Sequence, residues 1–169
     1  MKIALVLHNI RSTYNVGAIL RTAEGLGVEQ VLFSGYTPRF DDPKLLPHLR
    51  TKLNHQIAKS ALGAEQLVPQ QSLEDLPAYL AKQRQQGWRI VGLENNLTPE
   101  ELPRQLILGQ KADLGQQIVL ILGEEVEGIA SAIRAQLDNF LEIPMQGQKE
   151  SFNVSVAAAI ALWALKNLY

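Results

Sequence analysis

Arg21 could bind an anion, because a guanidinium group matches the geometry of phosphate and carboxylate. It ends the stretch 15-NVGAILR-21, in which Asn15 and Gly17 precede it. On a helix, Gly17 and Arg21 share a face, and the absent side chain of Gly17 leaves space beside the arginine. The alternative is a surface arginine that pairs with Glu24 on the next turn.

A second polar segment follows the apolar run 118–122, which ends at Gly123 and leads through three acidic residues to Gly128. A glycine at a strand end lets a ligand approach the backbone. The segment lacks the Gly-Lys-Ser/Thr of a phosphate-binding loop and the Gly-x-Gly-x-x-Gly of a dinucleotide site. Its acids suit ribose hydroxyls or a cationic ligand. The alternative is an acidic first turn for the helix after Gly128.

The third segment, 143-IPMQGQKESFNVSV-156, places polar side chains between a strand and an apolar helix. Pro144 lacks an N–H and ends the strand. Ser151, Asn153 and Ser155 surround the start of the helix. Serine and asparagine are common helix caps, but one cap does not need three of them. Simple capping and a binding site both stay open.

These segments require elements that bring them together. Alternating strand and helix patterns predict an α/β fold with a mostly parallel sheet and flanking helices. Ligands of such sheets bind beyond the carboxyl ends of the strands, where all three segments begin. Expected strands are 3–7, 31–33, 67–68, 89–94, 118–122 and 140–144. Expected helices are 16–26, 72–86, 129–137 and 153–168, with Asn15 and Ser72 as the first two N-caps, and a polar excursion at 41–59 ends in another helix.

Composition limits the function classes. The 169 residues include no cysteine, which excludes disulfides and cysteine-ligated metal. The histidines show no metal-ligand spacing, so no metal is expected. With no signal peptide and no apolar run that could span a bilayer, we expect a cytoplasmic protein without a membrane partner. The net charge is −1, but residues 1–60 carry eight Lys/Arg against four Asp/Glu. That local excess suits phosphate or a solvated loop.

Taken in order, the three segments resemble the signature motifs of the SpoU-type RNA ribose 2′-O-methyltransferases, in the SPOUT superfamily. The matching residues are Asn15-x-Gly17-x-x-x-Arg21, Gly123-Glu124-x-x-x-Gly128, and Ile143-Pro144-Met145 with Ser151-Phe152-Asn153-Val154-Ser155-Val156-Ala157. Phe152 stands where the family usually has leucine. The resemblance covers essentially the whole chain and implies a deep trefoil knot near the C-terminus and a homodimer. We expect a single domain over residues 1–169 with no appended RNA-binding domain.

The resemblance implies transfer of a methyl group from S-adenosylmethionine to a ribose 2′-hydroxyl of RNA, leaving S-adenosylhomocysteine, without a metal. We expect tRNA in preference to ribosomal RNA as the substrate. The alternatives are a non-catalytic RNA-binding module of the same fold, a nucleotide-binding oxidoreductase, and a structural dimerisation protein. The residues matched to catalysis are Arg21, Asn15, Glu124, Ser151 and Asn153, and those matched to the cofactor site are Leu93, Leu122, Gly123, Ile143, Met145 and Phe152.

The family's catalysis is attributed to the arginine that Arg21 matches, sometimes as a general base. A guanidinium group stays protonated in proteins and is a poor proton acceptor. Stabilising the developing negative charge on the ribose oxygen, or holding the adjacent phosphate, suits Arg21 better.

Overall fold

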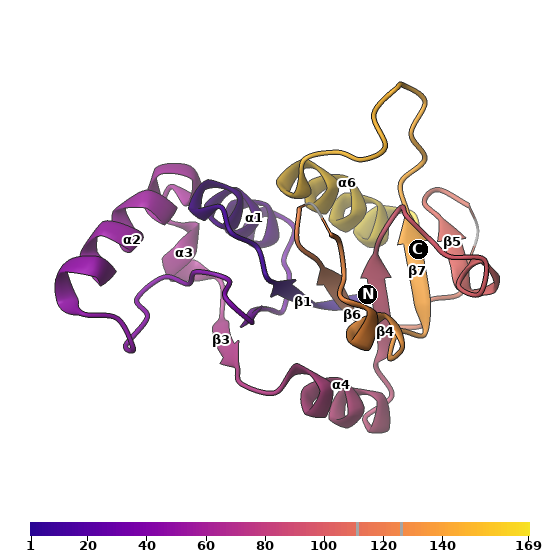
Figure 1. Ribbon diagram of the computed structural model, residues 1–169, viewed down its shortest axis with the longest axis horizontal. Coiled ribbons are helices and arrows are strands. Elements are labelled where there is room, and N and C mark those ends of the chain that lie inside the picture. Colours follow the sequence, from indigo (N-terminus) through magenta and orange to yellow (C-terminus); the bar gives the residue numbers. More distant parts are fainter. Residues whose placement is uncertain (111, 126) are drawn as a thin grey trace.

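Seven strands form one parallel sheet in the computed structural model, which describes residues 1–110, 112–125 and 127–169 (Figure 1). Their order is β3-β2-β1-β6-β4-β7-β5, and each pair of neighbours runs parallel. The strands are β1 Lys2–His8, β2 Gln30–Ser34, β3 Gln70–Leu73, β4 Arg89–Leu93, β5 Gln105–Ile107, β6 Gln117–Leu122 and β7 Asn139–Glu142. The helices are α1 Thr13–Gly25, α2 Pro47–Ala61, α3 Ala64–Leu67, α4 Leu76–Gln85, α5 Ser131–Arg134 and α6 Val154–Asn167, with a short 3-10 helix η1 at Leu102–Arg104.

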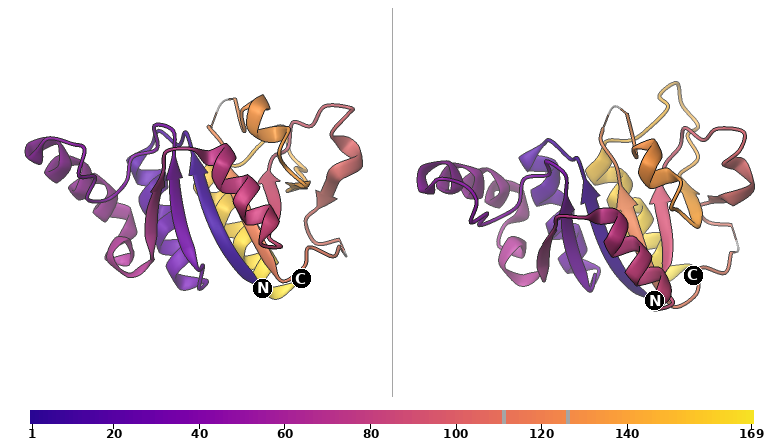
Figure 2. Two further views of the ribbon diagram at one scale, coloured as in Figure 1. Left: turned by 90° about the horizontal axis from the view of Figure 1, so that it is seen from below. Right: turned by 60° about the horizontal axis from the view of Figure 1, so that its bottom comes forward.

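Helices cover both faces of the sheet, because side chains of a strand alternate between the two faces (Figure 2). Along β1, Ile3, Leu5 and Leu7 belong to the core shared with α1 and α6. Ala4 and Val6 belong to the opposite core, shared with α4 and α5. Burial on both faces explains why β1 and β6 are continuously apolar.

The path of the chain defines where a ligand can bind. The chain runs outward from β1 to β2 and β3, then crosses to β4 on the far side of β6. The strand order therefore reverses around β1 and β6, and their carboxyl ends form the usual ligand position in open α/β sheets. The last helix, α6, returns to pack against α1. Its Lys166 Nζ donates a hydrogen bond to the carbonyl of Met1 (3.2 Å).

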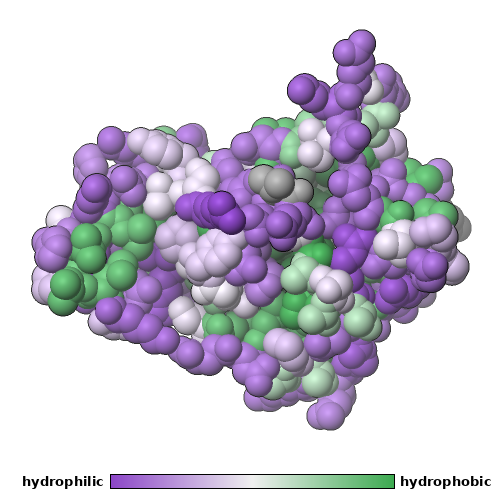
Figure 3. Space-filling view, in the orientation of Figure 1, coloured by the Kyte–Doolittle hydropathy of each residue, from purple (hydrophilic) through white to green (hydrophobic). Residues whose placement is uncertain are grey.

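The helix α2 packs on α1, and its fully buried residues lie in its C-terminal half. Ile57 in that half is fully buried. At the other end, Leu46 and Leu49 are 61% and 44% exposed, and apolar atoms gather over this end of α2 in Figure 3. The start of α2 thus projects away from the sheet (Figure 1).

The strand predictions are largely confirmed, with two differences at the sheet edges. The predicted strand at 67–68 is wrong, because Leu67 ends α3 and the strand is β3, at Gln70–Leu73. Three of its four residues are polar, since an edge strand needs no continuous apolar pattern. The short edge strand β5 was not predicted. The strands predicted at 3–7, 31–33, 89–94, 118–122 and 140–144 correspond to β1, β2, β4, β6 and β7.

Two predicted helix caps are wrong. The side chain of Ser12, not Asn15, caps α1 by accepting a hydrogen bond from the backbone N–H of Asn15 (3.3 Å). Asp75 caps α4, and Ser72 lies in β3. The predicted helix 129–137 is reduced to the single turn of α5. Within the described ranges, no helix is long and apolar enough to cross a membrane.

Candidate functional site

A cavity lies at the carboxyl ends of β4, β6 and β7 and is closed by the start of α6. Its walls are residues 93–96 after β4, residues 122–125 and 128 after β6, and residues 143, 151–154 and 157 between β7 and α6. The cavity is therefore at the edge of the sheet where the sequence predicts a ligand.

Many of the residues singled out in the sequence converge on this cavity. Those that line it are Leu93, Leu122, Gly123, Glu124, Ile143, Ser151, Phe152 and Asn153. Met145 follows the wall residue Ile143 and is half-buried, but it does not line the cavity. Asn15 and Arg21 also lie outside the lining. The second and third segments thus form the cavity together with residues 93–96, and the first lies beside it.

Asn15 is connected to the cavity rim through its side chain. Its Nδ2 donates to Glu125 Oε1 (3.1 Å), and its Oδ1 accepts from Asn153 Nδ2 (3.3 Å). The Oδ1 of Asn153 accepts from the backbone N–H of Ser155 and so caps α6 (3.0 Å). One asparagine therefore serves both as a helix cap and as a contact to α1. Glu125 was not among the predicted site residues, although its place in an acidic cluster pointed to it.

Arg21 lies further along α1, with an exposed side chain. The pairing with Glu24 considered from the sequence is not formed, and no ion pair to Arg21 occurs among the described residues. The expected space beside Arg21 is also absent. A Cβ on Gly17 would lie 2.2 Å from Ser60 Oγ and 2.3 Å from the carbonyl oxygen of Ile57. The helix α2, not a ligand, fills the space that Gly17 leaves.

The glycines at the end of β6 are required by the loop itself. Gly123 and Gly128 pack backbone to backbone, so that a Cβ on Gly123 would lie 2.4 Å from the carbonyl carbon of Gly128. Two backbone hydrogen bonds join Glu124 to Gly128, each 3.0 Å long. Gly128 has φ of +70°, which glycine adopts without strain. Close packing of the turn, and not only access of a ligand, explains both glycines. Val126, inside this motif, lies outside the described residues.

The described wall residues include three carboxylates, on Glu94, Glu124 and Glu125, and no Lys, Arg or His. Two of the carboxylates have cationic partners outside the lining. Arg11 Nη2 lies 2.9 Å from Glu124, and Arg134 Nη1 lies 3.1 Å from Glu94. Such a wall suits a ligand that carries positive charge or hydroxyl groups. Among the described residues, no group of three or more His, Asp or Glu side chains could hold a metal ion.

Glu94 and Asn95 are wall residues that sequence reasoning missed as site residues. Glu94 was treated only as the end of a strand. The available signal was the polar pair directly after the carboxyl end of β4, which is where parallel sheets present their binding residues.

The chain is similar to known RNA methyltransferases. The sequence model of the SpoU rRNA Methylase family matches residues 2–163. A 23S rRNA (guanosine-2′-O-)-methyltransferase, RlmB of Ralstonia nicotianae, is 32% identical over 159 residues. That alignment covers 94% of this chain and 56% of the relative, so the chain spans about half the length of the relative.

Solved structures share the fold. An AdoMet-bound rRNA methyltransferase from Sinorhizobium meliloti superposes with a TM-score of 0.76 at 20% identity, covering 99% of this chain and 56% of that one. A structure described as concerning 2-OH methylation of C/U34 on tRNA superposes with a TM-score of 0.73 at 22% identity. It is matched over 99% of this chain and 96% of its own. At these identities the likeness establishes the architecture.

Proposed function

This chain belongs to the SpoU rRNA methylase family, and on that premise we propose that it transfers a methyl group from S-adenosylmethionine to a ribose 2′-hydroxyl of RNA. The oxidoreductase considered from the sequence is thereby set aside. The observation that carries the proposal is the cavity itself. Its walls come from the second and third signature segments and from residues 93–96 after β4, and they bear three carboxylates and no cationic residue among those described.

S-adenosylmethionine, when bound, supplies an electrophilic methyl group on a positively charged sulfur. The acidic, partly apolar cavity fits such a ligand. We propose that backbone and side chains near Leu93, Leu122, Gly123, Ile143 and Phe152 hold it, all of which line the cavity. Met145 is proposed to support this wall from just outside.

Methyl transfer is an in-line displacement that requires alignment of the ribose oxygen and removal of one proton. We propose that Ser151, Asn153 and Asn15 orient the ribose at the rim, where the two asparagines are hydrogen-bonded to each other. Glu124 shapes the mouth of the cavity, paired with Arg11. Arg21 acts as an electrostatic group that stabilises the developing negative charge on the ribose oxygen or holds the neighbouring phosphate.

A homodimer is part of the proposal. The exposed side chain of Arg21 lies outside the cavity of its own chain, and we propose that a second subunit brings it near a reacting ribose. The helix α6 supports this assembly through an apolar stripe. Val156 and Trp163 on this stripe are 46% and 54% exposed, and Ile160 between them is half-buried. Burial of this stripe by a second copy would exclude water from it.

RNA is proposed to dock on the surface that includes α2. This projecting helix carries Arg50, Lys52 and Lys59 and no acidic residue. Basic side chains on a projecting element suit the phosphate backbone. We propose tRNA as the substrate, supported by the structural neighbour that concerns C/U34 of tRNA. Ribosomal RNA is the second candidate, supported by the relative named for guanosine in 23S rRNA.

Three further features remain proposals. We propose that the C-terminal segment is threaded into a deep trefoil knot, as the family resemblance implies. The packing of α6 against α1 is consistent with it, and an experimental structure without threading would overturn it. A single domain over residues 1–169 and a cytoplasmic location, where tRNA and ribosomes are found, complete the proposal.

The test is methyl transfer to RNA from a strain that lacks the gene. Purified protein, S-adenosylmethionine and separated tRNA or ribosomal RNA are incubated, and nucleosides are identified by mass spectrometry. A new 2′-O-methylnucleoside in tRNA supports the proposal, and one in ribosomal RNA selects the second candidate. Calorimetry is expected to detect one S-adenosylhomocysteine site per chain. Folded protein that binds S-adenosylhomocysteine but modifies neither RNA favours the non-catalytic module.

A further inference from the structure

Two consecutive residues after β4, Glu94 and Asn95, each reach a different loop of the cavity. We propose that they are positioning residues, which hold the three walls of the cavity at the spacing that its ligand requires, and that Arg134 fixes Glu94 from behind. The inference rests on the proposed function, because the ligand is taken to be S-adenosylmethionine. It concerns side chains whose main contacts are with the protein, not with the reacting atoms.

Asn95 connects the wall after β4 to the wall after β7. Its Nδ2 donates to the carbonyl oxygens of Ile143 (3.0 Å) and Glu150 (3.1 Å). Its Oδ1 accepts from the backbone N–H of Ile143 (3.4 Å). The carboxamide therefore uses both of its N–H groups and its oxygen on one segment, 143–150. Most of this segment is exposed and lacks regular structure, so these hydrogen bonds are a main restraint on its position.

Glu94 connects the same wall to the wall after β6. Its Oε2 accepts from the backbone N–H of Ile129 (3.0 Å), and its Oε1 accepts from the N–H groups of Asn95 (3.0 Å) and Asn96 (3.3 Å). The carboxylate occupies the space beside Gly128, where a Cβ would lie 2.2 Å from Oε2. The residue is only 9% exposed. A bulkier residue at position 128 would separate the two walls.

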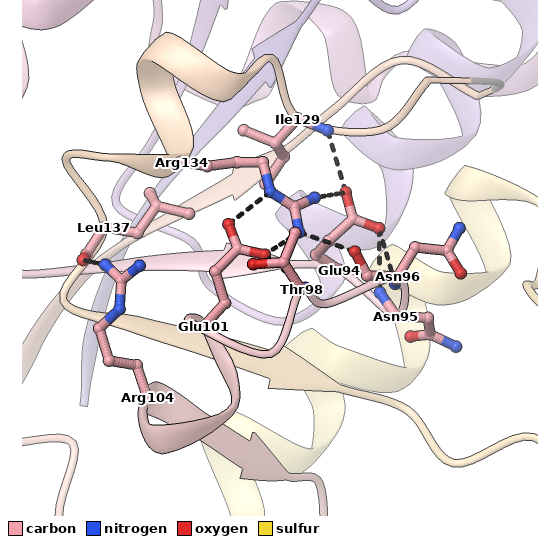
Figure 4. A network of polar contacts seen from close by, with 9 residues as sticks. All are labelled: Glu94, Asn95, Asn96, Thr98, Glu101, Arg104, Ile129, Arg134 and Leu137. Carbon is pink, nitrogen blue, oxygen red and sulfur yellow. Dashed lines mark hydrogen bonds and ion pairs between the residues drawn. The ribbon is translucent and has the colours of Figure 1, made fainter.

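Arg134 supplies the charge that lets this carboxylate stay buried (Figure 4). Its Nη1 lies 3.1 Å from Glu94 Oε2, and its Nε donates to Glu101 Oε1 (2.8 Å). Its Nη2 donates to the carbonyl of Asn96 (2.7 Å) in the wall after β4. The guanidinium also lies over the ring of Phe140, 5.2 Å from its centroid. A buried carboxylate without such a partner is strongly disfavoured, so Arg134 keeps Glu94 in place.

The arrangement has a functional consequence. The wall after β4 is joined to the wall after β6 by Glu94 and to the wall after β7 by Asn95. Loss of either link lets one wall move, and a ligand that needs all three then binds a less organised site. The expected effect is on ligand affinity rather than on the chemical step.

The test uses the variants Asn95→Ala and Arg134→Met in the full chain. Each is expected to weaken S-adenosylhomocysteine binding by about tenfold or more, because a buried hydrogen-bonding group loses its partner. The KM for S-adenosylmethionine should rise more than kcat falls. Hydrogen exchange in the ligand-free protein should become faster at 143–150 in Asn95→Ala and at 128–129 in Arg134→Met. Binding is measured well below each variant's unfolding temperature.

Matched controls exist at the amino ends of β4 and β7, at the opposite end of these strands from the cavity. Arg84 contacts Asp138 (3.1 Å) and the carbonyl of Gln136, as Arg134 contacts Glu101 and Asn96, but it is remote from the cavity. Asn139 Nδ2 donates to the carbonyl of Arg104 (3.3 Å). Arg84→Met and Asn139→Ala should leave S-adenosylhomocysteine affinity unchanged.

The outcomes separate the inference from the proposed function. If the wild-type protein does not bind S-adenosylhomocysteine, the proposed function fails, and this inference fails with it. If the wild type binds and Asn95→Ala and Arg134→Met bind equally well, only the inference is overturned. Equal loss of affinity in the test and control variants also overturns it, because general destabilisation then explains the result.

Discussion

At the scale of single residues, the polar side chains near the cavity differ in what they contact. Asn15, Glu125 and Asn153 form a hydrogen-bonded chain at the rim, which holds their side chains relative to one another. Arg21 makes no ion pair among the described residues and is exposed. An arginine without a structural partner is available to a phosphate or a developing oxyanion.

Arg21→Ala is expected to retain S-adenosylhomocysteine binding and to lower kcat for methyl transfer by roughly 10²–10³-fold, the usual effect of removing an electrostatic stabiliser. Calorimetry and single-turnover assays measure the two quantities separately. Arg89→Ala is the control, because Arg89 is an exposed arginine remote from the cavity. Single-turnover activity of Arg21→Ala close to that of the wild type would contradict the assigned role.

The carboxyl group of Glu101 makes the free energy of unfolding of the protein depend on pH in the acidic range. The hydrogen bonds from Arg134 are the main cause that lowers its pKa from 4.5 to about 2. Because the pKa of the folded state is the lower one, this carboxylate contributes stability above pH 4.5 and loses it as pH falls towards 2.

The variant Glu101→Gln should therefore show a weaker loss of unfolding free energy than the wild type between pH 4.5 and 2. Urea unfolding followed by circular dichroism across this range measures it. Glu74→Gln serves as the control variant. Glu74 forms an exposed ion pair with Lys44, and because solvent screens this pair, the substitution should change the pH dependence of stability little. Parallel pH profiles for the wild type and Glu101→Gln would show that the pairing contributes nothing.

At the scale of elements, the close contact of α1 with α2 determines how α2 leaves the sheet. Gly17 allows the backbone of α1 to approach Ile57 and Ser60, and Ser60 Oγ donates to the carbonyl of Tyr14 (2.9 Å). The glycine in the first signature segment therefore serves helix packing. This contact holds the start of α2 away from the body, where exposed Leu46 and Leu49 lie beside the basic residues Arg50 and Lys52.

Gly17→Ala should destabilise the protein by about 1–3 kcal/mol, because the added methyl group meets the backbone of α2 and overpacks the interface. Gly25→Ala is the matched control in the same helix, since nothing lies within 4 Å of a Cβ there. It should be neutral or stabilise by up to about 1 kcal/mol, as expected of alanine in a helix. Denaturant unfolding measures both, and equal stabilities for the two variants would rule out the packing explanation.

At the scale of the whole molecule, two features are consistent with the proposed homodimer. They are the exposed apolar stripe on α6 and the position of Arg21 outside the cavity.

Trp163→Glu is expected to shift the protein from dimer to monomer and to abolish most methyl transfer, because a charge replaces an apolar contact in the proposed interface. Analytical ultracentrifugation gives the mass in solution. Leu67→Glu is the control, because Leu67 is 69% exposed but lies on α3. A wild-type protein that sediments as a monomer, or a Trp163→Glu variant that remains dimeric and active, would refute this interface.

The sequence by itself determined the α/β class, the central strands and the three polar segments, because hydrophobic period and glycine or proline punctuation are local properties. It could not reveal that Gly17 packs on α2, that Ser12 rather than Asn15 caps α1, or that Glu94 and Asn95 join the cavity walls. The contacts of Gly17, Glu94 and Asn95 join residues distant in sequence, which only the parallel sheet and its crossovers bring together. The choice between Ser12 and Asn15 is local and depends on the residue at which α1 begins. The edge strands β3 and β5 were not predicted at their observed positions for a related reason. Pairing with a neighbouring strand, not an apolar pattern of their own, makes these segments strands.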